Sequence, residues 1–243
     1  YAPSVAGGVI MAIIFGILLV AHIFNLARKR TWWCFPFIVG ALFELVGYAC
    51  RVMGNKNPYS SGPYIVGTLA ILLAPILFAA SVYMFLGRIV RSTGCDSYSM
   101  IRTTWLTKIF VGGDISCFLI QAVGAVMITS NGGGNTKNTG KYIILFGLVL
   151  QVVIFLFFLV VGIVFHKRMN SRGPNTKRTA STFDWQKYIN QLYIVSIFIT
   201  IRNIFRTVEY AVGTNGYLLT HEWPLYVFDG TLMIFVLAIT WFW

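Results

Sequence analysis

Two arginines and a glutamate lie along one side of an apolar stretch of this sequence. Arg202, Arg206 and Glu209 are spaced by four and three residues, so they share one face if the stretch is helical. A guanidinium group is a planar donor for phosphate or carboxylate, and a carboxylate can hold an amine. An ionised side chain inside a membrane costs at least ~2.5–3.5 kcal/mol, so this face needs polar partners or a wet cavity.

Other polar residues repeat this spacing. Glu44, Tyr48 and Arg51 form a second stripe with intervals of four and three residues, while Asp114 and Gln121 share a face seven residues apart. The complete set of candidate ligand-binding residues is Arg202, Arg206, Glu209, Asp229, Glu44, Tyr48, Arg51, Asp114, Gln121, Gln151, His221 and Glu222.

The composition is that of an integral membrane protein. The 243 residues are 57% hydrophobic and only 11% charged, against roughly 25% charged in soluble domains, and the mean hydropathy is +0.75. A helix that crosses ~30 Å of hydrocarbon needs about 20 residues. We therefore expect an all-α fold, a single seven-helix transmembrane domain over residues 1–243. The expected spans are 5–27, 33–53, 64–90, 103–129, 142–165, 188–212 and 223–243.

The basic residues predict the orientation of this bundle. Segments 28–32, 88–108 and 166–187 carry thirteen lysines and arginines, whereas the alternate connections with Arg51 carry four. Positively charged loops stay on the cytoplasmic side. The sequence thus predicts an extracellular N-terminus, a cytoplasmic C-terminus and contact with anionic cytoplasmic lipid rather than nucleic acid. The longest basic loop is 166–187, and the glycine-rich stretch 132–140 is expected to be a flexible connection.

The predicted interior combines both signs of charge. Counting along the helices places Glu44 and Asp114 near mid-membrane, with Arg202, Arg206, Glu209 and Asp229 in the outer half. Together with Arg51, these side chains suit an amphiphile with a polar head and an apolar tail, in a cavity between the second, fourth, sixth and seventh helices. The alternative is that the charges pair with one another and hold the helices together.

Catalysis and metal binding are disfavoured by the histidines. His22, His166 and His221 are neither deep in the membrane nor spaced as a ligand pair, so we expect no enzyme and no metal site. His221 is predicted on the opposite side from the other two, which also disfavours a haem held between histidines. No cofactor is expected, with haem or porphyrin as the alternative.

A resemblance rests on motifs in six of the helices. They are Glu44–Arg51, Ala74-Pro75 with Ala79-Ala80, Tyr83 and Gly87-Arg88, Asp114 with Gln121 and Gly124, Gly147 with Gln151, Arg202 with Arg206 and Glu209, and His221-Glu222 with Tyr226 and Asp229. In this order they resemble the fungal RTA-like family, also called the lipid-translocating exporter family, over essentially the whole chain. The resemblance implies a seven-helix protein linked to sphingoid long-chain base release, resistance to toxic amphiphiles or, in one branch, porphyrin uptake.

Three functional hypotheses follow. The first is a plasma-membrane transporter or translocase in which the arginines hold an anionic group, Glu44, Glu209 and Asp229 a cationic one, and Asp114 a proton. The second is a seven-helix lipid sensor that signals through the 166–187 loop. The third is porphyrin or haem binding, which predicts a Soret absorbance. The sequence does not choose the lipid, the direction of movement or the oligomeric state.

Overall fold

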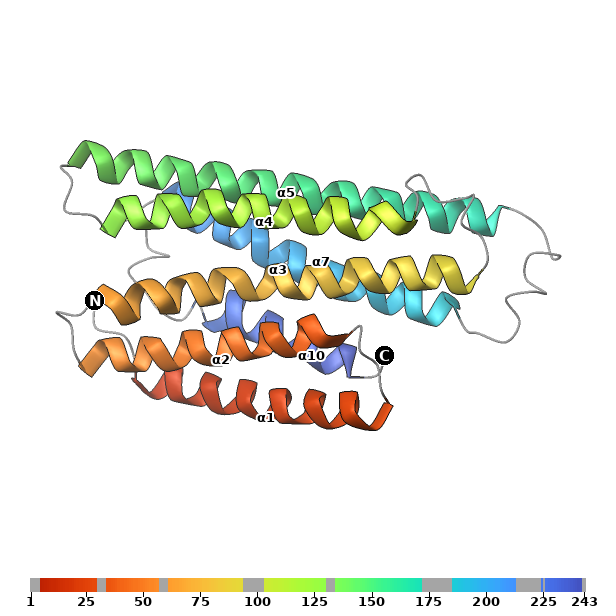
Figure 1. Ribbon diagram of the computed structural model, residues 1–243, viewed down its shortest axis with the longest axis horizontal. Coiled ribbons are helices and arrows are strands. Elements are labelled where there is room, and N and C mark those ends of the chain that lie inside the picture. The colour runs from red at the N-terminus through yellow and green to blue at the C-terminus, as the bar shows by residue number, and fades with distance from the viewer. Residues whose placement is uncertain are drawn as a thin grey trace.

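The protein is a bundle of helices. The computed structural model describes residues 5–29, 34–56, 61–93, 103–129, 134–171, 185–212, 224 and 226–241, and no strand occurs among them. The described chain forms seven helical segments, the last of which joins a π-helical turn to an α-helix (Figure 1). They are α1 (Val5–Lys29), α2 (Phe35–Lys56), α3 (Ser61–Ser92), α4 (Thr103–Thr129), α5 (Gly134–Asn170), α7 (Trp185–Val212) and η3 (Tyr226–Thr231) with α10 (Leu232–Thr240).

The expected all-α class is confirmed, and most helix bounds lie within a few residues of the predicted ones. Two differences carry structural meaning. The helix α5 begins at Gly134, so most of the stretch 132–140 is helical, and its prediction as a flexible connection was wrong. The final segment is not one α-helix as predicted, because Tyr226–Thr231 forms a wide π-helical turn before α10.

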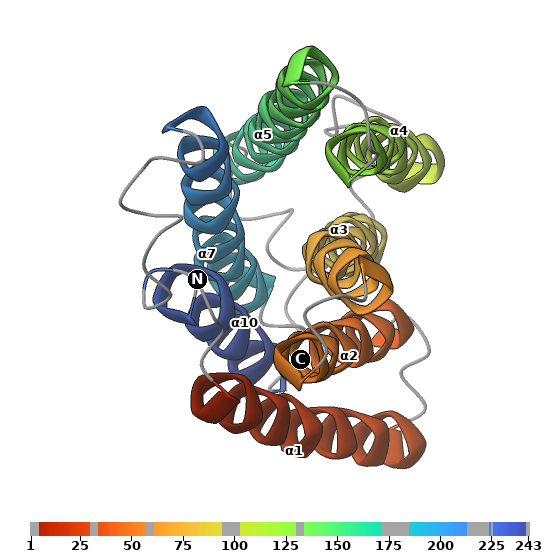
Figure 2. The ribbon, with the colours of Figure 1, turned by 90° about the vertical axis from the view of Figure 1, so that its left-hand side faces the viewer.

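The helices form a closed ring, and α3 also makes contacts across it. Each helix packs on the next in the chain from α1 to α7; α7 then packs on α10, and α10 returns to α1 (Figure 2). The helices α3 and α7 also pack directly on each other, although many residues separate them in sequence. This contact places the polar face of α7 against α3.

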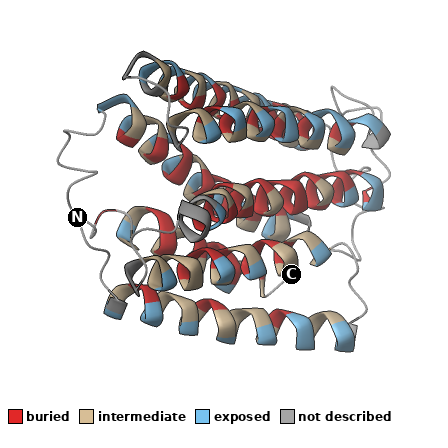
Figure 3. Cartoon of the chain, turned by 60° about the vertical axis from the view of Figure 1, so that its left-hand side comes forward, coloured by how far each residue is buried: buried red, intermediate tan, exposed pale blue. Residues whose placement is uncertain are grey.

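Burial differs sharply between the helices. In the most apolar window of α3, 78% of the residues are buried, against 11% in α1 (Figure 3). The exposed faces remain apolar, as Ile17 and Val20 of α1 and Phe146 of α5 illustrate. Large apolar side chains on the outside are stable in lipid but not in water. The protein is therefore an integral membrane protein with α3 at its centre.

Five of the described helices are long and apolar enough to cross a membrane by themselves. The helix α7 falls outside this group because polar and charged residues lower its hydropathy, and Tyr226–Thr240 is shorter than the others. These two segments contain the buried charges described below. Their polar side chains must be satisfied by other helices, since lipid offers them no hydrogen bonds.

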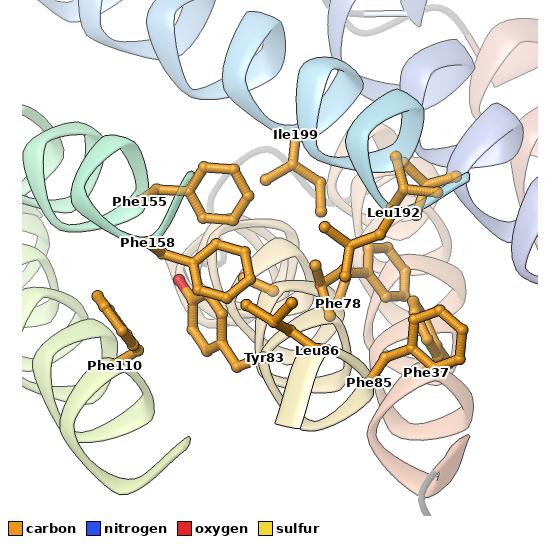
Figure 4. Close-up of a cluster of buried hydrophobic side chains, with 14 of the residues drawn as sticks. Phe37, Phe78, Tyr83, Phe85, Leu86, Phe110, Phe155, Phe158, Leu192 and Ile199 are labelled. Carbon is orange, nitrogen blue, oxygen red and sulfur yellow. The ribbon is translucent and has the colours of Figure 1, made fainter. Parts of the chain in front are cut away.

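An aromatic cluster fills the space where α3, α4 and α5 meet. The ring of Tyr83 lies 4.5 Å from that of Phe158 and 5.4 Å from that of Phe110, measured between centroids (Figure 4). Phe155 completes the group at 6.0 Å from Tyr83. Edge-to-face and tilted ring pairs of this kind add to the energy of burial. The cluster fixes α4 and α5 to one side of α3.

A close backbone contact joins the end of α4 to the beginning of α5. A Cβ atom on Gly124 would stand 2.7 Å from the carbonyl oxygen of Gly140 and 3.0 Å from the amide nitrogen of Ile144. Only glycine at position 124 leaves room for this approach. Small residues at helix contacts allow such packing in membranes, where lipid gives helices little hydrophobic reason to associate.

Replacing Gly124 by alanine should lower the free energy of unfolding by ~1–3 kcal/mol, because the added methyl group overpacks against rigid backbone. The measurement is reversible unfolding of the purified protein in mixed detergent micelles. Gly112→Ala on the same helix is the matched control, since a Cβ there meets no atom within 4 Å. The control should be neutral or slightly stabilising. Equal losses for both variants would contradict the tight contact.

Candidate functional site

One carboxylate in the last segment binds both buried arginines of α7. Asp229 accepts a hydrogen bond from Arg202 Nε at 2.5 Å on its Oδ1 atom and one from Arg206 Nη2 at 2.8 Å on its Oδ2 atom. Arg206 Nη1 also donates to Glu209 Oε2 at 3.1 Å, one turn along the same helix. The spacing of Arg202, Arg206 and Glu209 therefore does place them on one face, and Asp229 is the partner which that face required.

These ionic groups are sealed inside the protein. Asp229 is fully buried, Arg202 is 1% exposed and Arg206 is 6% exposed. Two charges taken from water lose several kcal/mol of hydration each, and this loss is offset only when the hydrogen bonds are well formed. The structure thus shows a closed arrangement in which the arginine side chains already have acidic partners.

Arg202 also links α7 to a break in the hydrogen bonding of α3. Its Nη2 atom donates to the carbonyl oxygen of Ile71 at 2.9 Å. Pro75 is four residues after Ile71 and has no N–H, so it cannot donate to this carbonyl as an ordinary helical residue would. The guanidinium group supplies the missing donor. The proline in the middle of α3 and the arginine in the middle of α7 are therefore parts of one feature.

The π-helical turn shapes the last segment around Asp229. The side chain of Thr231 donates to the carbonyl oxygen of Tyr226 at 2.9 Å and satisfies a backbone acceptor of the wide turn. Gly230 leaves room for Tyr48, because a Cβ at position 230 would stand 2.7 Å from the Tyr48 hydroxyl. Isolated π turns frequently occur at functional sites. Here the turn brings Asp229 beside α2 as well as α7.

Glu44 and Tyr48 of α2 complete what we call the charged cluster, namely Glu44, Tyr48, Arg202, Arg206, Glu209 and Asp229. Glu44 is fully buried and interacts electrostatically with Asp229, Arg202 and Arg206. Both its carboxylate oxygens and the Tyr48 hydroxyl are without a hydrogen-bond partner among the described residues. Tyr48 is held by ring stacking, with centroids 5.6 Å from Phe15 and 6.2 Å from Tyr226.

The charges of this cluster do not balance. Two arginines stand against three carboxylates within the cluster, so one carboxylate is left over, and Arg51 of α2 interacts electrostatically with Tyr48 from outside the cluster. The arginines bind Asp229 and Glu209, which leaves Glu44 as the carboxylate without a direct partner. A buried carboxylate is stable only with a cation, a hydrogen-bond donor or a proton. Glu44 is therefore the carboxylate of the cluster whose oxygens can still accept a hydrogen bond.

The remaining sequence-predicted residues lie elsewhere. Asp114 accepts a hydrogen bond from Tyr83 at 2.8 Å within the aromatic cluster, and Gln121 donates to Gln151 at 3.0 Å between α4 and α5. The predicted cavity grouped the fourth helix with the second, sixth and seventh, but α4 packs on α3 and α5.

Three predictions involve the connections between helices. His221 and Glu222 lie outside the described residues, as does most of the 166–187 loop. Arg51 at the end of α2 is half-buried and makes interactions of its own. The sequence analysis did not identify Ile71 as a partner of Arg202. Pro75 was the signal that could have revealed it, because a proline always frees the carbonyl four residues before it.

Within the described residues, no group of three or more histidine, cysteine or acidic side chains is placed to hold a metal ion. The charged cluster contains no pair of nucleophile and base arranged for covalent chemistry. Its chemistry is the binding and pairing of charges, including the exchange of one cationic partner for another.

Comparison with known proteins identifies the family of this chain. The model of the RTA1-like protein family matches residues 37–243, which includes every member of the charged cluster. The chain belongs to the RTA1-like family. Protoporphyrin uptake protein 1 of Saccharomyces cerevisiae is 36% identical over 207 residues, covering 83% of this chain and 65% of that protein.

Two further yeast proteins are similar to this chain. Protein RTA1 of Saccharomyces cerevisiae is 33% identical, covering 84% of this chain and 63% of the relative. The sphingoid long-chain base transporter RSB1 of the same species is 24% identical over 266 residues, covering 95% of this chain and 69% of the relative. The chain spans less than two thirds of protoporphyrin uptake protein 1 and of protein RTA1. No solved structure matches.

Replacing Asp229 by asparagine should destabilise the protein by ~3–5 kcal/mol, because two buried guanidinium groups lose their shared counter-charge. Reversible unfolding in mixed micelles measures this loss. Adding Arg202→Gln to Asp229→Asn removes one of the stranded charges, so the double variant should lose less than the sum of the single losses. Strict additivity would show that the 2.5 Å contact contributes no coupling energy.

Proposed function

We propose that this protein is a membrane transporter or translocase for amphiphilic lipids that carry an amine, with sphingoid long-chain bases as the substrate class. It would act as a single seven-helix domain in the plasma membrane, with the N-terminus outside, and would contribute to resistance to toxic amphiphiles. Family membership and the named activity of the sphingoid base transporter support this class of function. Relatives named for uptake or transport also favour a transporter over an enzyme.

The unpaired carboxylate of Glu44 is the observation that carries the proposal. Its two oxygens are buried and unpaired, and it is the third carboxylate in a cluster with two arginines. An ammonium group supplies both the missing positive charge and several N–H donors. The unpaired Tyr48 hydroxyl could bond to a hydroxyl of the same headgroup. A lipid with a protonated amine beside hydroxyl groups would supply partners for both Glu44 and Tyr48.

The sealed cluster also suggests how such a lipid would be handled. Its arginines hold α7, α3 and the last segment together through Asp229 and Ile71, while Glu44 comes from α2. For a headgroup to enter, α2 must separate from the last segment at the contact between Tyr48 and Gly230. The ion pairs of Asp229 would then keep α7 and the last segment together while α2 moves. The described structure corresponds to the closed state of this cycle.

Porphyrin uptake is the second candidate, because a relative with that named function is 36% identical. A porphyrin carries carboxylates, which need arginines as partners. Both arginines of the cluster are bound to acidic residues, so a porphyrin would have to displace Asp229 or Glu209. The charge excess of the cluster therefore favours an amine-bearing lipid over a porphyrin.

Replacing Glu44 by glutamine should reduce transport of a fluorescent long-chain base at least tenfold, because the amide keeps the size but removes the charge that attracts the amine. The measurement uses proteoliposomes containing the purified variant. Glu44→Asp keeps the charge and should retain part of the activity. Detergent gel filtration checks that both variants fold.

Ser81→Ala serves as the matched control, since Ser81 is another fully buried residue of the bundle with an unpaired polar atom. It lies outside the charged cluster and should leave transport unchanged. Full transport of the long-chain base by Glu44→Gln would overturn the proposal. A Soret band and porphyrin uptake that both vanish in Arg206→Gln, with no transport of the base, would favour the second candidate.

A further inference from the structure

A groove of about 540 Å³ lies between α5 and α7, away from the charged cluster. Leu159 and Ile163 of α5 and Ile197 of α7 line its apolar part. His166 and Lys167 of α5, with Tyr193 of α7, line the part nearer the end of α5. The groove is open toward the outside of the bundle, so lipid can reach it without any helix moving.

The two parts follow one another along the helix axis. Lys167 comes eight residues after Leu159, which is ~12 Å at 1.5 Å per residue. This length compares with ~15 Å for one half of the hydrocarbon layer. The groove therefore runs parallel to a lipid chain, from the hydrocarbon toward the headgroup level. The apolar and polar parts together therefore extend over most of the thickness of one hydrocarbon leaflet.

We call Tyr193 and His166 the polar wall of the groove, because contacts within the bundle hold both side chains in place along its side. Tyr193 donates to the carbonyl oxygen of Gly162 at 3.2 Å, and its hydroxyl lies 3.2 Å from His166 Nδ1. The rings of Tyr193 and His166 stack with centroids 5.8 Å apart. Because these contacts join α7 to α5, the wall is already in place before any ligand arrives. Such preorganisation lowers the entropy lost on binding.

Among the described residues that line the groove, the charge of the polar part is positive. Lys167 is exposed, and no aspartate or glutamate belongs to the residues that line the groove. Asn170 and Ser171 add an amide and a hydroxyl beside it. Basic pockets at the end of transmembrane helices bind the headgroups of anionic lipids. From this charge and the adjoining apolar channel, we infer that the groove binds one anionic phospholipid, with its phosphate at Lys167 and an acyl chain along Leu159, Ile163 and Ile197.

This site differs in chemistry from the one in the proposed function. The charged cluster has an excess of negative charge and is closed, whereas the groove is basic and open. The lipid in the groove would act as a bound component between α5 and α7 rather than as transported cargo. Its binding does not depend on Glu44, so either proposal can fail while the other stands.

Native mass spectrometry of the purified full chain tests the inference, with phosphatidylserine and phosphatidylcholine of identical acyl chains as probes. The wild-type protein should retain one phosphatidylserine in preference to phosphatidylcholine. Lys167→Ala should weaken that binding about fivefold, the weight of one lysine at an anionic headgroup. Ile163→Trp should abolish it by filling the apolar part.

Matched controls separate the groove from general surface effects. Arg168→Ala removes the same charge one position around the helix, and Val160→Trp adds the same ring at a site as exposed as Ile163, at 49%. Neither residue lines the groove, so both variants should bind phosphatidylserine normally. Equal losses in Lys167→Ala and Arg168→Ala would overturn the inference in favour of a diffuse basic surface. Loss of all bound phosphatidylserine on addition of inorganic phosphate would also overturn it, since the site would then bind a free anion rather than a lipid.

Discussion

The interior depends on two ion pairs, which Asp229 forms with Arg202 and with Arg206. In a membrane, apolar helices gain little by burying their surfaces on one another, so a few polar contacts decide which helices meet. Arg202 extends the contact to the free carbonyl of Ile71 in α3. One guanidinium group thereby satisfies a carboxylate of the last segment and a carbonyl exposed by Pro75. Without it, two separate polar groups would face a solvent that cannot hydrogen-bond.

The rest of the bundle fits around this centre. The aromatic cluster with Tyr83 holds α4 and α5 on the far side of α3, and the glycine contact at Gly124 brings those two helices close together. Asp114 accepts a hydrogen bond from Tyr83 there on one of its two carboxylate oxygens and takes no part in the charged cluster. The charged cluster and the hydrogen bonds around Asp114 are therefore separate polar regions with different neighbours. The charged cluster lies between α2, α7 and the last segment. The other region consists of hydrogen bonds that join α3, α4 and α5.

The proposed function makes use of this division between the polar regions. A site for a charged headgroup must release its guest, so its own charges need internal partners when the guest has left. Asp229 and Glu209 serve the two arginines in this way, whereas both oxygens of Glu44 have no hydrogen-bond partner among the described residues. The open groove beside Lys167 would serve a lipid that stays bound. Opposite signs of charge at the two places suit lipids with opposite headgroups.

The sequence by itself determined the membrane class, the helices and the residues that share a face, because composition and helical periodicity are local properties. The π-helical turn and the early start of α5 escaped it, since both depend on contacts with other helices. Sequence counting also gave Glu44 and Asp114 the same depth, yet they occupy different interfaces. Depth along a helix follows from the rise per residue, but position around the bundle follows only from packing. Tertiary structure alone therefore decided that Arg202 meets Asp229 and Ile71, the latter 131 positions away.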